Sequence, residues 1–152
     1  MSTRTQDSCH TVPLEDHVFV ALMKAADSLA QQAEQLLKAA GLSGTQYNVL
    51  RILRGAEPRG LACGEIAERM ISRDPDITRL LDRMEKRGLI TRQRQTDDRR
   101  VVKTRITAAG LAALKTLDVP VHEMHKKQFQ HMSATRLKTL SNLLRELQGG
   151  LS

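Results

Sequence analysis

A chain of 152 residues is long enough for one globular domain, or for a small domain with an oligomerisation appendage. Because 40% of its residues are hydrophobic, a chain that is disordered throughout is excluded. No stretch approaches the roughly 18 apolar residues of a membrane span, and the polar N-terminus lacks the apolar core of a secretory signal, so we expect a cytoplasmic protein. The formal net charge of +7 favours a polyanionic partner, while the 2% of aromatic residues disfavours proteins that stack single-stranded bases on aromatic platforms.

The first predicted element is a long helix over residues 14–40. Apolar side chains recur at steps of three and four, close to a heptad seam, and Gly41 follows in the position of a C-terminal cap. The seam consists of Leu14, Val18, Leu22, Ala25, Leu29, Ala33, Leu36 and Ala40. A helix of about 40 Å in so small a protein is expected to pack against more than its own domain.

Three shorter helices are predicted between residues 43 and 88. Ser43 and Gln46 form the pattern of a capping box at the start of the first, and the second covers about residues 64–70. In the third, Asp74 is the expected N-cap, Pro75 takes the first helical position and Gly88 ends the helix. Its inner face is apolar, with Ile77, Leu80, Leu81 and Met84. Its outer face is polar and mostly cationic, with Thr78, Arg79, Asp82, Arg83 and Lys86.

The period changes to two over residues 89–107, which predicts a β-hairpin with turn residues at 96–99. The alternating positions are Ile90, Arg92 and Arg94 on one strand and Val102, Thr104 and Ile106 on the other. Residues 92–105 hold six basic and two acidic side chains, a balance of +4 that exceeds half of the net charge. The hairpin is therefore expected to have a strongly basic tip.

Two further helices are predicted at the C-terminal end. Thr107 is the expected cap of the first, which Pro120 should kink or interrupt, and Ser133 is the cap of the second. The second carries another heptad seam, formed by Leu137, Leu140, Leu144, Leu147 and Leu151. Two long seams without enough partner surface inside the domain predict a homodimer, although they could also be plain intramolecular core.

The predicted elements include two short helices joined by a turn, and the second of these helices is cationic. A basic hairpin follows them. This order of elements is typical of proteins that recognise duplex DNA. A helix fits the major groove, and an Arg on the hairpin can reach the neighbouring minor groove. The alternative is a solvated amphipathic face. We expect a mainly α fold with a small β-hairpin wing, a winged helix-turn-helix with N- and C-terminal dimerisation helices. Residues 1–42 would form the N-terminal arm and long dimerisation helix, 43–107 the DNA-binding domain, and 108–152 the C-terminal dimerisation helices.

Two segments carry a family resemblance. Residues 98–107 (DRRVVKTRIT), followed by Ala108-Ala109-Gly110, resemble the wing signature of the multiple antibiotic resistance regulator (MarR) family, and residues 77–90 resemble its recognition helix. The resemblance covers nearly the whole chain. It implies a transcriptional regulator, a homodimer with intertwined terminal helices that binds a pseudo-palindromic operator. It also implies a ligand-responsive repressor with a pocket for small aromatic or phenolic compounds, for which His17 and Tyr47 are our candidate lining residues.

Carried over by position, the resemblance implies that Arg100 enters the minor groove while Asp98 holds it by an ion pair. It also implies that Thr78, Arg79 and Arg83 face the major groove. For Asp98 and Arg100 the alternative is a turn-stabilising ion pair. Further DNA-binding candidates are Arg73, Asp76, Arg94 and Arg99. Asp76 departs from the small polar residues common there, and phosphates should repel it unless it accepts a hydrogen bond from a cytosine amino group.

The sequence also leaves other functions open. The winged-helix dimer could be architectural, or bind proteins, without a ligand switch. Cys63 at a helix start could be a redox-sensing thiol, whereas Cys9 lies upstream of the reactive cysteine of the family's peroxide sensors. His122, His125 and His131 could hold a metal but are expected to be surface histidines, and two cysteines are too few for a disulfide framework. No phosphate loop or nucleophile motif indicates an enzyme or a cofactor.

Overall fold

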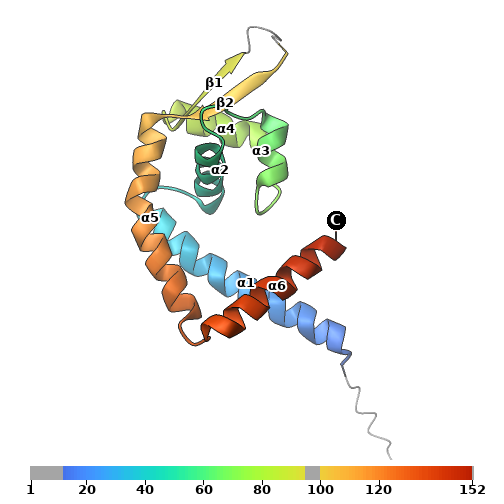
Figure 1. Ribbon diagram of the computed structural model, residues 1–152. Helices are drawn as coiled ribbons and strands as arrows, with labels where there is room; N and C mark the ends of the chain where they lie inside the picture. The colour runs from blue at the N-terminus through green and yellow to red at the C-terminus, as the bar shows by residue number, and fades with distance from the viewer. Residues whose placement is uncertain (1–11, 95–99, 152) are drawn as a thin grey trace, which may run out of the picture. The chain divides into compact units, whose positions relative to one another are not determined.

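The computed structural model describes residues 12–94 and 100–151 and contains six helices and one hairpin in these ranges. In chain order they are α1 (Leu14–Ala39), α2 (Gly44–Gly55), α3 (Cys63–Arg69), α4 (Ile77–Lys86), β1 (Ile90–Arg94), β2 (Val102–Ile106), α5 (Ala108–Phe129) and α6 (Ala134–Gly150) (Figure 1). This order confirms the predicted mainly α fold with a β-hairpin wing. The chain divides into two compact units, Met1–Gln32 and Ala33–Ser152.

The junction between α1 and α2 is fixed by local sequence. Gly41 has φ +74°, and the Leu42 amide donates to the Leu37 carbonyl at 3.0 Å, which ends α1 as predicted. The Gln46 amide donates to Ser43 Oγ and the Ser43 amide to Gln46 Oε1, each at 3.2 Å, which confirms the capping box. Leu37 is buried although it lies outside the predicted seam, because it packs with Leu42 on the core of the second unit.

The core lies between α2, α4, α5 and the two strands, all within the second unit. Its buried side chains include Val49, Leu50, Leu53, Ile66, Leu80, Leu81, Met84, Ile90, Ile106, Leu114, Leu117 and Val121. The apolar face predicted for α4 is thereby confirmed, with Ile77 half-buried at its edge. Burial of this face leaves the opposite side of α4 toward solvent.

Helix α4 begins two residues later than predicted, so Asp74 is not its N-cap. The Asp76 amide donates to Asp74 Oδ1 at 2.8 Å, a local turn that holds Asp76 at φ −131°, outside helical geometry. Asp76 is the cap instead, and its Oδ1 accepts from the Arg79 amide at 3.3 Å. The prediction failed because both aspartates are good caps and the Asp74 turn decides between them.

The wing follows directly from the end of α4. Gly88 has φ +71°, a backbone conformation that favours glycine, and the Leu89 amide donates to the Met84 carbonyl at 3.1 Å. Strands β1 and β2 then pair antiparallel from Ile90 opposite Ile106 to Arg94 opposite Val102. The predicted turn at 96–99 lies outside the described residues.

A backbone bridge anchors β2 on its other edge. Thr104 donates its amide to the Leu61 carbonyl at 2.7 Å, and Leu61 donates to the Thr104 carbonyl at 3.0 Å. The segment before α3 is therefore joined to the wing by two main-chain hydrogen bonds, and the root of the wing is held on both sides.

The C-terminal helices begin where predicted. Thr107 Oγ1 accepts from the Gly110 amide at 3.1 Å and Ser133 Oγ accepts from the Arg136 amide at 3.3 Å. Helix α5 continues through Pro120 to Phe129, so the expected interruption is wrong. Proline removes one hydrogen bond from this 22-residue helix, and the buried Leu114, Leu117 and Val121 hold the helix on both sides of it.

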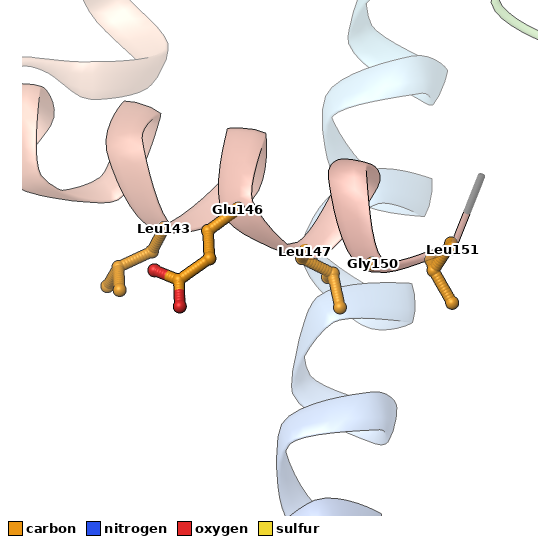
Figure 2. Close-up of a pocket in the computed structure, with 5 residues that line it drawn as sticks. All are labelled: Leu143, Glu146, Leu147, Gly150 and Leu151. Carbon is orange, nitrogen blue, oxygen red and sulfur yellow. The ribbon is translucent and has the colours of Figure 1, made fainter.

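Several apolar residues in the second half of α6 lie on a surface that the single chain does not cover. None of its residues is buried, and Leu143 and Leu147 are 57% and 42% exposed. Figure 2 shows Leu143, Leu147 and Leu151 projecting from one side of α6 along an open groove. In the described ranges, no helix is both long and apolar enough to cross a membrane.

Candidate nucleic-acid interface

The solvent side of α4 carries the polar face that the sequence predicts. Thr78, Arg79 and Arg83 are all exposed, while Leu80 and Leu81 beneath them are 1% exposed. Arg73 is exposed in the segment between α3 and α4. Thr78, Arg79 and Arg83 thus lie on the second helix of the helix-turn-helix, from which base edges are contacted in such folds.

Asp76 has a local partner at the start of this face. Its Oδ2 lies 3.1 Å from Arg79 Nε in an i, i+3 ion pair, and its Oδ1 caps the helix. The carboxylate is therefore compensated by a cation and by a backbone amide before any DNA is present. This reduces the phosphate repulsion expected from the sequence and gives Asp76 a structural role.

The wing supplies a second group of exposed cations. Arg94 is exposed at the end of β1, and Arg100 is exposed two residues before β2 begins. Asp98 and Arg99 lie outside the described residues, so the ion pair between Asp98 and Arg100 stays a prediction. Arg94 and Arg100 thus flank the hairpin tip, at the positions from which a wing can reach a minor groove.

Two of the basic residues of the hairpin form ion pairs with the helices. Arg92 donates to Glu85 and Asp82 of α4, and Lys103 Nζ lies 2.9 Å from Glu65 Oε2 of α3. The side chains of Arg92 and Lys103 are only 25% and 19% exposed. The basic surface of the wing is therefore smaller than its charge count suggests. The sequence pattern that indicates this position of Arg92 is its alternation with Ile90, because residues two apart lie on the same face of a strand.

Glu65 joins α3 to the wing. Its Oε2 accepts from the Ala62 amide at 2.7 Å and from Lys103, and its Oε1 accepts from Arg59 at 3.1 Å. The Ala62 hydrogen bond, followed by the Lys103 hydrogen bond, lowers the pKa of Glu65 from 4.5 to about 2. The carboxylate is therefore charged throughout the neutral range.

The two candidate ligand residues lie in different units of the chain. His17 is exposed on α1 in the first unit, and Tyr47 is half-buried on α2 in the second. Arg51 lies over the Tyr47 ring, with its guanidinium carbon 5.9 Å from the ring centroid. The role of His17 and Tyr47 in a ligand pocket stays a prediction.

The other candidate residues also have definite positions. Cys63 is a half-buried free thiol at the first residue of α3, whereas Cys9 lies outside the described residues. His122, His125 and His131 are exposed. Within residues 12–94 and 100–151, no group of three His, Cys, Asp or Glu side chains has the geometry to hold a metal ion.

Comparison with known proteins decides the family. Residues 42–102 match the family model of the MarR family. The crystal structure of a MarR transcription factor from Planctomyces limnophilus is 39% identical, covers 88% of this chain and 97% of its own, and superposes with a TM-score of 0.68. The chain belongs to the MarR family. The resemblance of the recognition helix and wing signature predicted this membership.

Other MarR-type proteins share the chain's length and fold. The homoprotocatechuate degradative operon repressor of Escherichia coli is 26% identical over 133 residues, which is 88% of both chains. The Staphylococcus aureus MepR in a MepR–DNA complex is 20% identical, covers 91% of this chain and 99% of its own, and has a TM-score of 0.77, which shows a shared fold. The present MarR-family protein is a DNA-binding transcriptional regulator with a winged helix-turn-helix, and its relatives are regulators of transcription.

Proposed function

We propose that this MarR-family protein is a homodimeric repressor that binds a pseudo-palindromic duplex operator, with α4 in the major groove and the wing in the adjacent minor groove. The observation that supports this best is the exposed face of α4, with Thr78, Arg79 and Arg83 opposite a fully buried apolar face. In this proposal Arg94, Arg99 and Arg100 bind the minor groove and nearby phosphates.

Dimerisation is supported by the apolar side chains at the two ends of the chain. On α1, Leu14, Val18 and Phe19 are 72%, 54% and 64% exposed, and α6 has no buried residue at all. Surfaces of this kind are covered in homodimer interfaces, which are more apolar than the rest of a protein surface. Two-fold pairing would also present two recognition helices to two half-sites. Residues 1–42 and 108–152 would then serve dimerisation, and residues 43–107 DNA binding.

The proposed effector is a small aromatic or phenolic compound that releases the repressor from DNA. Support comes from the similar Escherichia coli repressor, which is named for the degradation of homoprotocatechuate, a phenolic acid. Tyr47 on α2 offers such a compound a half-buried aromatic ring with a hydroxyl group. Because its target is chromosomal DNA, we place the protein in the cytoplasm.

Selection of bound duplexes from a random pool tests the proposal. We expect an enriched pseudo-palindrome whose half-sites lie about one helical turn apart, since a two-fold dimer sets that spacing. Affinity should fall steeply with salt, with a slope of about −0.9 per phosphate neutralised. A phenolic panel added to the selected duplex should release the protein. Enrichment of no sequence, or a monomer without affinity for duplex DNA in dilute buffer, would overturn the proposal.

A further inference from the structure

We propose that Glu85, through its hydrogen bonds to Arg92, is a positioning residue that holds the wing at the angle to α4 that DNA binding requires. An acidic side chain of the recognition helix would thus strengthen binding to a polyanion. This inference rests on the proposed function, because it assumes that α4 and the wing contact the same duplex.

The contact between the two residues is dense. Arg92 Nε and Nη2 donate to Glu85 Oε2 at 2.9 and 2.7 Å, and the Arg92 backbone amide donates to Glu85 Oε1 at 3.0 Å. Arg92 Nη2 also donates to Asp82, one turn earlier on α4. Because Glu85 binds the main chain as well as the guanidinium, it fixes the strand itself and not only one side chain.

The position of this contact explains why it would matter. Glu85 lies in the last turn of α4 and Arg92 in the middle of β1, with the Gly88 turn between them. The charge-assisted hydrogen bonds between Glu85 and Arg92 join the two ends of this short connection. They therefore restrict the angle between α4 and β1. Arg94 lies two residues beyond Arg92 on the same strand, so a change of that angle would displace it.

The second strand is held in a comparable way. Lys103 of β2 pairs with Glu65, which also caps α3 through the Ala62 amide. Each strand of the wing is therefore bound by a carboxylate from one helix of the helix-turn-helix. The Leu61–Thr104 bridge fixes the root of β2, whereas the Glu85 contact ties β1 to the recognition helix.

Charge alone predicts the opposite effect of Glu85. The cluster of Arg92, Glu85 and Asp82 carries one positive and two negative charges, a net −1 beside a surface that approaches phosphates. If these groups acted only as charges, loss of the Glu85 charge would make the cluster less negative and raise DNA affinity. If Glu85 positions the wing, the same change lowers affinity. The sign of the effect therefore separates the two interpretations.

The experiment measures binding of the full-length protein to its selected duplex over a salt series. Glu85→Gln is expected to weaken binding about ten-fold despite the loss of a negative charge. Arg92→Ala should weaken binding by a similar factor with an unchanged salt slope, because Arg92 neutralises no phosphate. Arg92→Lys keeps the charge but loses the planar fork, and should fall between wild type and Arg92→Ala.

Glu68→Gln is the matched control, since it removes an exposed carboxylate on α3. It should not weaken binding. Urea unfolding of every variant distinguishes a folded protein with a displaced wing from a protein that no longer folds. Arg92→Lys remains informative if Glu85→Gln fails to fold. Binding by Glu85→Gln as tight as wild type, or an Arg92→Ala salt slope shallower by about one phosphate, would overturn the inference. A wild-type protein that binds no duplex would instead overturn the proposed function.

Discussion

Arg87 Nη2 donates a 2.8 Å hydrogen bond to the backbone carbonyl oxygen of Gly41, 46 residues earlier in the chain. Its Nη1 donates at 3.0 Å to Gln46 Oε1, which also accepts from the Ser43 amide in the capping box of α2. One guanidinium thus joins the end of α4 to the end of α1 and the start of α2. The recognition helix is held at its C-terminal end by the junction that leads out of α1.

Replacement of Arg87 by Ala should destabilise the protein by about 1 kcal/mol, because two hydrogen bonds to the α1–α2 junction are lost. Lys86→Ala is the matched control, since it removes a neighbouring exposed cation from the same helix end. Urea unfolding at fixed protein concentration measures both. Equal losses for the two variants would mean that only the charge at the helix terminus matters.

Arg83→Ala should cost about 1–3 kcal/mol of operator binding and relax the preference for particular bases, if its side chain contacts a base edge. Competition gel shifts with single-base variants of the selected duplex provide the measurement. Lys115→Ala on α5 removes an exposed cation outside the proposed interface and should leave base preference intact. Unchanged discrimination in Arg83→Ala would remove it from the proposed base contacts.

Arg100→Ala should weaken binding to many sequences by similar factors, because it removes a cation from the wing and not a base-specific contact. The salt slope should also become shallower by about one phosphate equivalent. A salt titration on selected and random duplexes tests both effects. A loss confined to the selected duplex would instead indicate sequence recognition by the wing.

Glu65 gives the stability a defined pH dependence. Its pKa is about 2 in the folded protein and 4.5 ordinarily, so its stabilising effect is present above pH 4.5 and is lost as the pH falls toward 2. Glu65→Gln should therefore be less stable than wild type at pH 7. The gap in urea midpoint should narrow between pH 4.5 and 2. A gap for Glu65→Gln that persists unchanged at pH 2 would contradict this account.

Leu147→Asp should turn the dimer into a monomer and reduce operator affinity, because it places a charge among the exposed leucines of α6. Sedimentation equilibrium measures the association state directly. Asn142→Asp introduces the same charge on the opposite face of α6 and should leave the dimer intact. A Leu147→Asp protein that remains dimeric would exclude this face from the interface.

The features that could be predicted from sequence are those set within a few residues. The Ser43–Gln46 box, the Gly41 and Gly88 helix ends and the alternating residues of the two strands all follow from local sequence. Ion pairs such as Glu85–Arg92 could not be assigned, because the sequence contains 17 acidic residues and the choice of partner depends on the angle of the strands. Asp74 and Asp76 show the same limit at short range, since two suitable caps stood side by side.

Gly110 lies so close to the Leu89 carbonyl that an added Cβ would be 2.4 Å from that oxygen, and the Thr107 amide donates to the same carbonyl at 3.1 Å. A single methyl group at position 110 would therefore push the start of α5 away from the exit of the recognition helix. For protein engineering this means that a chimaera grafting this winged helix onto another regulator must keep a glycine at position 110, because any residue at position 89 presents the same carbonyl oxygen.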